Sequence, residues 1–117
     1  MTTTSNTPGK TTIALEVLVT IARLTTLSVD GVSRMATVPS EMNRLFKRGV
    51  SEGVKINVDE DMVYTDLYVI LKQDFNVRDV SHNIQANVSR AISEMVGMEV
   101  GKINVHIEDI ELTAFNQ

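Results

Sequence analysis

The sequence contains no cysteine and no tryptophan, and aromatic residues make up only 4% of its 117 positions. Without cysteine, the chain can form no disulfide, no zinc–thiolate site and no cysteine nucleophile. With so few aromatics, it offers little material for a platform that stacks single-stranded bases. These absences favour a small domain held together by an ordinary apolar core.

Basic charge and long apolar runs are also in short supply. The chain has 11 Lys and Arg against 15 Asp and Glu, a net charge of −4, whereas nucleic-acid-binding domains usually present a net basic face. The most apolar run, residues 13–29, contains Glu16 and Arg23 and is too short and too polar to span a bilayer. We therefore expect a soluble chain with no nucleic-acid partner, whose membrane role, if it has one, is peripheral or through a partner.

The chain divides into one domain and two tails. Residues 1–10 are rich in Thr, Ser and Asn and lack the pattern of a secretory leader, so we expect a disordered tail, a single domain at 11–112 and a C-terminal tail at 113–117. The expected elements of the domain are a short strand at 10–13, a helix at 15–28, a strand at 32–36, a short helix at 40–46, strands at 54–58 and 63–71, a helix at 77–96 and a strand at 103–108.

Period-two alternation predicts the central hairpin. Placing Val58 and Val63 both toward the core pairs them across the turn, which sets Lys55 opposite Asp66 as an exposed ion pair. The second long helix should bury a stripe that runs from Val80 to Met95. Layering two helices on one sheet face buries every apolar stripe. The sequence thus predicts an α+β fold, a small mixed sheet of three to five strands with two main helices packed on one face.

The sequence contains few residues that could act in catalysis or bind a metal. His82 and His106 are the only histidines; they are expected on a polar helix face and an outward strand face, as solvated residues that point apart. A zinc site needs three or four converging ligands. The acidic run 59–61 fits a solvated hairpin turn better than a calcium loop. We expect no catalytic residue, no metal and no cofactor.

Three features suggest contact surfaces instead. The helix at 15–28 is apolar around most of its perimeter, which is typical of a central core helix or of one that also mediates self-association. On the outward sheet face, one strand presents a row of large side chains. A basic cluster follows Pro39, either a solvated helix end or a contact for acidic lipid or an acidic partner. The candidate surface residues are Tyr64, Tyr68, Ile70, Arg44, Lys47 and Arg48.

Several sequence blocks, in order and spacing, resemble the bacterial alkaline shock protein family of envelope stress response proteins. The blocks are residues 12–22, 29–32, 53–58, 66–70, 83–88 and 103–107. The resemblance covers roughly residues 11–109. Two positions depart from the family pattern: Leu15 stands where Pro is common at the helix start, and residues 39–48 replace a Gly-rich stretch.

This resemblance implies non-enzymatic work by an oligomerising cytoplasmic protein linked to envelope homeostasis and to alkaline or other stress. It implies partners of two kinds, further copies of the chain and a membrane-anchored protein. It supplies no catalytic residue. Two alternatives remain at this point: a KH-like nucleic-acid-binding module, which the acidic charge and the absence of a Gly-x-x-Gly loop disfavour, and a small-ligand-binding domain, which would need a deep pocket with converging polar groups.

Overall fold

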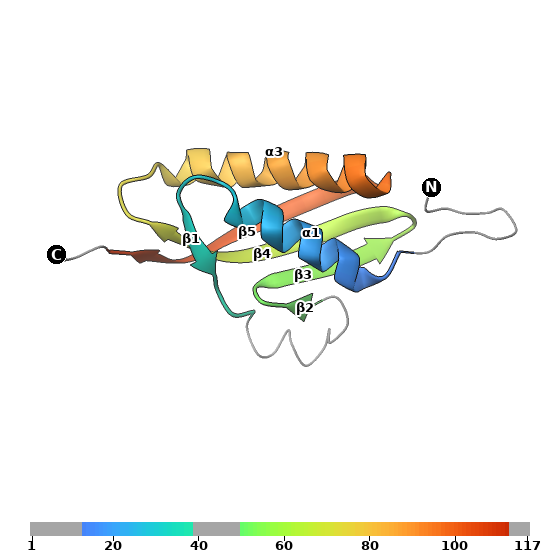
Figure 1. Ribbon diagram of the computed structural model, residues 1–117, viewed down its shortest axis with the longest axis horizontal. Coiled ribbons are helices and arrows are strands. Elements are labelled where there is room, and N and C mark those ends of the chain that lie inside the picture. Colours follow the sequence, from blue (N-terminus) through green and yellow to red (C-terminus); the bar gives the residue numbers. More distant parts are fainter. Residues whose placement is uncertain (1–12, 39–49, 113–117) are drawn as a thin grey trace, which may run out of the picture.

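The computed structural model describes residues 13–38 and 50–112. Figure 1 shows two layers, with the helices on one side of the sheet. The elements in chain order are α1 (Leu15–Leu27), β1 (Val32–Met35), β2 (Val50–Ser51), β3 (Val54–Asp59), β4 (Met62–Lys72), α3 (Val77–Val96) and β5 (Glu99–Glu111). The predicted α+β class and element order are confirmed. The predicted short helix at 40–46 and both tails lie outside the described residues, and Ile13, the described end of the expected first strand, is not in a strand.

Local sequence signals set both ends of α3 where they were predicted. The Asn76 side chain accepts a hydrogen bond from the Asp79 backbone N–H at 3.0 Å, which caps the first turn. The acidic side chain of Asp79 also favours the positive end of the helix dipole. Gly97 ends the helix in the left-handed conformation, with φ 73°. The helix therefore lies between two residues that sequence alone identifies as caps.

Strand β4 is the centre of a five-stranded mixed sheet. On one side it pairs antiparallel first with β3 and then, further along, with β1; on the other it pairs parallel with β5. β2 continues the sheet beyond β3. The β3–β4 register matches the prediction, with Val58 opposite Val63 and Lys55 opposite Asp66. Both residues of the turn, Glu60 and Asp61, have positive φ, a backbone that suits the twist of a two-residue hairpin.

Tyr68 lies at the junction where β4 changes partner from β3 to β1. Its N–H donates to the Gly53 carbonyl at 2.8 Å, and its carbonyl accepts from the Ala36 N–H at 2.7 Å. Gly53 has φ 83°, and a Cβ there would lie 2.5 Å from the Ala36 carbonyl oxygen. The close approach of three backbones therefore requires glycine at this position.

The core fills the space between the helices and one sheet face. Its fully buried side chains come from α1, β3, β4 and α3. Two predicted core positions are wrong: Val58, at the end of β3, is 37% exposed, and Met95, in the last turn of α3, is 68% exposed. Strand β5 is also longer than predicted, with 13 residues, because it follows β4 along its whole length.

Candidate interaction surfaces

A polar cluster lies on the sheet face opposite the helices, centred on Asp66 of β4. The Asp66 carboxylate accepts from the Asn104 amide at 3.1 Å, contacts His106 Nε2 at 3.0 Å and lies 3.5 Å from Lys55 Nζ. Lys55 lies on β3, which pairs antiparallel with β4, and Asn104 and His106 lie on β5, which pairs parallel with β4. The side chains of Lys55 and Asp66 are only 14% and 21% exposed, so this ion pair is more enclosed than the exposed pair the sequence predicted.

Two opposing effects set the protonation of Asp66. Burial alone would raise the pKa of its carboxyl group. Hydrogen bonds from His106 and Asn104, together with electrostatic attraction from Lys55 and His106, outweigh that effect, and the pKa lies below its ordinary value. The carboxylate is therefore held in its charged form. That charge joins β3, β4 and β5 on this face.

Tyr68 completes the same cluster. Its ring stacks on the His106 imidazole with centroids 4.4 Å apart and planes 9° from parallel. Burial, reinforced by the negative charges of Asp66 and Glu108, raises the pKa of the Tyr68 hydroxyl. The cluster thus holds a neutral tyrosine and a charged aspartate beside one imidazole, an arrangement that fastens strands together.

The predicted residues of the outward face lie on that face, but they are not equally accessible. Tyr64 is 37% exposed, whereas Tyr68 and Ile70 are only 3% and 9% exposed. The expectation that all three present a row of accessible side chains is therefore wrong for two of them. Arg44, Lys47 and Arg48 lie outside the described residues.

The two histidines differ more than sequence reasoning expected. His82 is exposed on α3, as predicted. His106 lies on the outward strand face, as predicted, with its side chain 40% exposed, but it also contacts Asp66 and Tyr68 and is therefore only partly solvated. Within residues 13–38 and 50–112, no group of three or more His, Cys, Asp or Glu side chains is placed to hold a metal ion.

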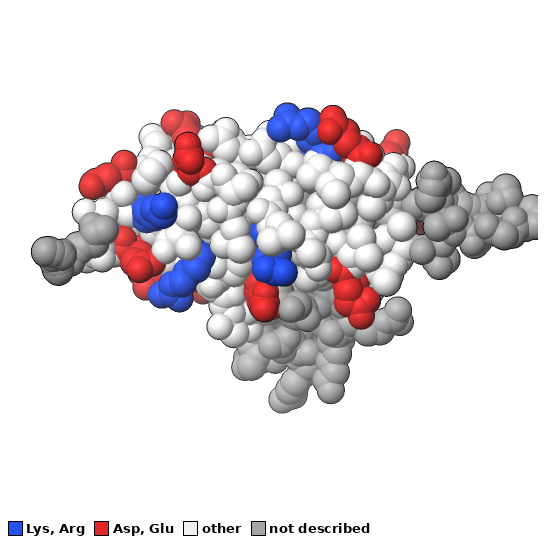
Figure 2. All heavy atoms as spheres, in the orientation of Figure 1, with Lys and Arg blue, Asp and Glu red and all other residues white. Residues whose placement is uncertain are grey.

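A second candidate surface is an apolar stripe on α1. Val17, Leu24 and Leu27 are 44%, 55% and 38% exposed and follow one another at spacings of seven and three, which places them on one side of the helix. Figure 2, seen from the helix side, shows a largely uncharged area over α1, with most charged side chains around the rim. This α1 stripe leaves substantial apolar surface uncovered on the described chain.

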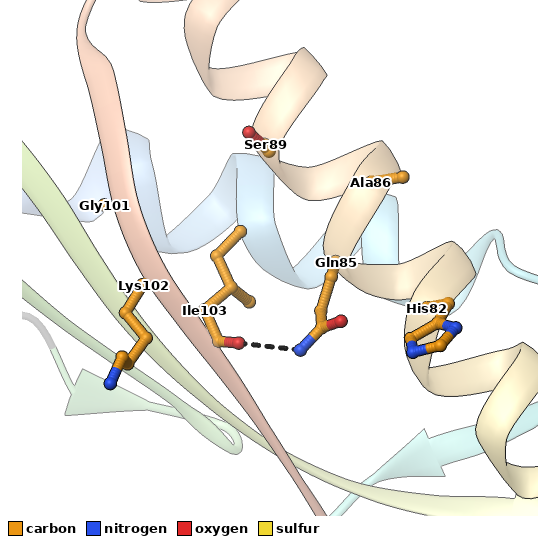
Figure 3. A pocket seen from close by; sticks show the side chains of 7 residues that line it. All are labelled: His82, Gln85, Ala86, Ser89, Gly101, Lys102 and Ile103. Atoms are coloured by element: carbon orange, nitrogen blue, oxygen red, sulfur yellow. Dashed lines mark hydrogen bonds between the residues drawn. The ribbon is translucent and has the colours of Figure 1, made fainter.

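A third feature is an open hollow of about 500 Å³ between α3 and β5. Figure 3 shows that its helix wall carries His82, Gln85, Ala86 and Ser89, while Lys102 points away from the helix. The Gln85 amide donates to the Ile103 carbonyl at 2.9 Å, so this side chain of the helix wall is already hydrogen-bonded to the strand. The hollow is shallow and lacks the converging free polar groups of a small-molecule site.

In the part of the chain that the structure describes, neither α1 nor α3 is long and apolar enough to cross a bilayer.

The Asp66 cluster is the feature that sequence reasoning missed. Asn104 and His106 lie 38 and 40 residues from Asp66 along the chain, so no local spacing connects them. The one visible signal was the predicted pairing of Lys55 with Asp66.

A comparison with protein families decides the relationship of the chain. The sequence profile of the alkaline shock protein 23 family, described as having a cell envelope-related function, matches residues 3–112. The chain belongs to this family. The predicted alkaline shock protein resemblance is thereby confirmed, because it names the same group of proteins.

Individual relatives come from Bacillus subtilis and Streptococcus pyogenes. The chain is 29% identical over 105 residues to the uncharacterized protein YqhY of Bacillus subtilis, a match that covers 88% of this chain and 78% of that protein. It is 33% identical over 104 residues to the uncharacterized protein Spy1535 of Streptococcus pyogenes, covering 87% and 79%. The uncharacterized B. subtilis protein YloU is 22% identical over 109 residues, covering 90% and 91%. No solved structure matches the chain significantly.

Proposed function

We propose that this alkaline shock family protein is a non-enzymatic, self-associating protein of the cell envelope stress response, and that it acts through protein–protein contacts. The family description supports the link to the envelope. The α1 stripe supports self-association, because contiguous exposed apolar surface on a small domain marks an interaction site. The same stripe is the single observation that carries the proposal.

Self-association can be tested on α1 with one charge. Leu24 is the most exposed member of the stripe, so Leu24→Glu should leave the core intact while placing a carboxylate in the contact. We expect light scattering after size exclusion to show a concentration-dependent oligomer for the wild type and a smaller species for L24E. Met95→Glu is the matched control, because Met95 is an exposed apolar residue on α3, and it should behave as wild type. A wild-type chain that stays monomeric at high concentration contradicts the proposal.

We propose further that the protein acts in the cytoplasm and reaches the envelope through a membrane-anchored protein. Purified protein should co-sediment with native membrane vesicles and lose that binding when a protease has removed their exposed proteins. Binding to protein-free lipid vesicles would argue for direct lipid contact instead.

A role in stress should be visible in growing cells. A strain that lacks the protein should tolerate a shift to alkaline pH less well than its parent. Wild-type protein should restore growth, and L24E should restore it less well although it is equally abundant. Full rescue by L24E would separate self-association from function.

A further inference from the structure

Strand β5 is an edge strand of the sheet. It pairs with β4 along ten positions, and no other strand in the described part of the chain pairs with it. An edge strand presents a row of unpaired backbone N–H and C=O groups and can add a further strand. Figure 1 shows β5 beside α3, at the border of the sheet.

The hydrogen bonds identify which residues of β5 face outward. Both backbone groups of Tyr68 point to the β3 and β1 side, so the odd-numbered residues of β4 point to β5. In a parallel ladder, the β5 residue directly opposite an odd-numbered β4 residue points its backbone N–H and C=O groups away from β4. The β5 residues opposite Thr65, Leu67 and Val69 are Ile103, Val105 and Ile107. The Ile103 carbonyl agrees with this direction, because it accepts from the Gln85 side chain of α3.

The regular part of this edge is short and well defined. The β4–β5 register shifts between the pairs of Val63 and Thr65, and again between those of Val69 and Ile70. Between these two irregularities, residues 103–107 form an uninterrupted run. Its apolar members Val105 and Ile107 pack against the core but are only partly buried, so an added strand would cover them further.

This run is self-complementary when two copies meet antiparallel. If the two-fold axis passes through Val105, each Val105 lies opposite its counterpart, and Ile103 lies opposite Ile107 of the second copy. Lys102 and Glu108 flank the run, each at one of the two irregularities, so opposite charges come near one another at both ends of the paired strands. Within the described residues, neither Lys102 nor Glu108 has an ion-pair partner. The outward groups of Val105 also face each other, as a hydrogen-bonded antiparallel pair requires.

We propose that residues 103–107 of β5 pair antiparallel with the same residues of a second copy of this chain, in register about Val105. The inference rests on the proposed self-association and adds to it a second contact, separate from the α1 stripe. The hollow beside Gly101, Lys102 and Ile103 leaves room at the start of the run, since Ala86 and Ser89 on its helix wall are small. On pairing, the Ile103 carbonyl exchanges the Gln85 amide for a backbone N–H.

A single engineered cysteine tests the register, because the chain has no cysteine of its own. Directly opposed residues of a hydrogen-bonded pair have Cα atoms about 5.5 Å apart, which lies within disulfide range. Val105→Cys should therefore cross-link into a covalent dimer under mild oxidation. Ile107→Cys is the matched control, because its two copies would lie about 13 Å apart, four residues along the strands. Absence of the V105C dimer, or equal cross-linking at both positions, would overturn the proposed register.

Charge exchange tests the same contact without changing the ladder. Lys102→Glu and Glu108→Lys should each weaken dimerisation about tenfold, because each places like charges near one another at both ends of the paired strands. The double variant K102E/E108K restores both pairs and should return to within about threefold of wild type. Singles that match the wild type, or a double variant as weak as the singles, would contradict the pairing.

The L24E background separates this inference from the proposed function. With the α1 contact removed, a dimer held through β5 should persist and should weaken about tenfold on adding K102E. A strictly monomeric L24E overturns the β5 contact and leaves self-association through α1 standing. An L24E protein that associates like the wild type, and is weakened about tenfold by K102E, supports β5 and overturns the α1 contact.

Discussion

The two faces of the sheet use the same strands but are held by different interactions. On the helix side, β4 contributes Val63, Leu67 and Leu71, all fully buried in the apolar core. On the other side, the same strand contributes Asp66, whose carboxylate joins β3 to β5 through hydrogen bonds and charge. One face is stabilised by the removal of apolar surface from water, and the other by satisfying a half-buried ion.

This difference predicts which substitutions destabilise each face most. An apolar face loses stability in proportion to the volume removed. A polar cluster gives a modest net stabilisation when complete but a larger penalty when its central partner is missing, because the remaining groups lose the acceptor that they share. Four changes test this contrast, and we order them by the size of the expected effect.

Leu67→Ala should cause the largest loss. Leu67 is completely buried in the core between the helices and the sheet, so the cavity should cost about 3 kcal/mol of unfolding free energy. Leu24→Ala is the control, because Leu24 is more than half exposed, and should cost under about 0.5 kcal/mol in the monomer. Urea unfolding at low protein concentration measures both. Equal losses would mean that the helix-side core does not determine stability.

Asp66→Ala should come next, with a loss of about 2 kcal/mol of unfolding free energy. The substitution leaves Lys55, Asn104 and His106 without their shared acceptor. Asp59→Ala removes a carboxylate from the same hairpin at an exposed position and should change stability by less than about 0.5 kcal/mol. If the two substitutions prove equivalent, the cluster contributes nothing beyond ordinary surface charge.

Sequence reasoning predicted the helix-side face better than the outer one. Alternation along β3 and β4 located Leu67 and its neighbours, and the turn fixed the register that places Lys55 opposite Asp66. No such local signal fixes β5 against β4, because a 20-residue helix, α3, separates the two strands. His106 therefore looked like a solvated residue, and Tyr68 like an exposed one.

The burial of two residues was overestimated for a related reason. Val58 and Met95 both continue the apolar period of their elements, yet both are exposed. They lie at the end of β3 and in the last turn of α3. Period alone shows which face of an element is apolar, but it does not show where the element that covers this face ends.

The stability of the outer face should also depend on pH. The pKa of Asp66 is lowered from its ordinary value of 3.8, so the folded chain binds this proton less readily than the unfolded chain. The stabilisation is fully present above pH 3.8 and is lost as the pH falls further, through the folded-state pKa. The difference in unfolding free energy between wild type and Asp66→Ala should therefore shrink on acidification below that value. A difference that stays constant would show that the carboxylate charge is not what holds the cluster.

The smallest expected effect has the opposite sign and concerns a polar atom on the helix-side face. Thr65 is 1% exposed, and its hydroxyl has no hydrogen-bond partner among the described residues. Valine has nearly the same shape and keeps the β-branch that suits a strand. Thr65→Val should therefore stabilise the fold by about 1 kcal/mol, because it removes an unsatisfied buried group without making a cavity.

Thr26 supplies the matched control for that change. It is equally buried, but its hydroxyl donates to the Ala22 carbonyl at 2.7 Å, so Thr26→Val should destabilise slightly, by about 0.5 kcal/mol. Two identical substitutions at buried positions would then differ in sign according to whether the hydroxyl is satisfied. If Thr65→Val lowers the unfolding free energy instead, the Thr65 hydroxyl has a partner in solution, and the helix-side face is less purely apolar than its packing indicates.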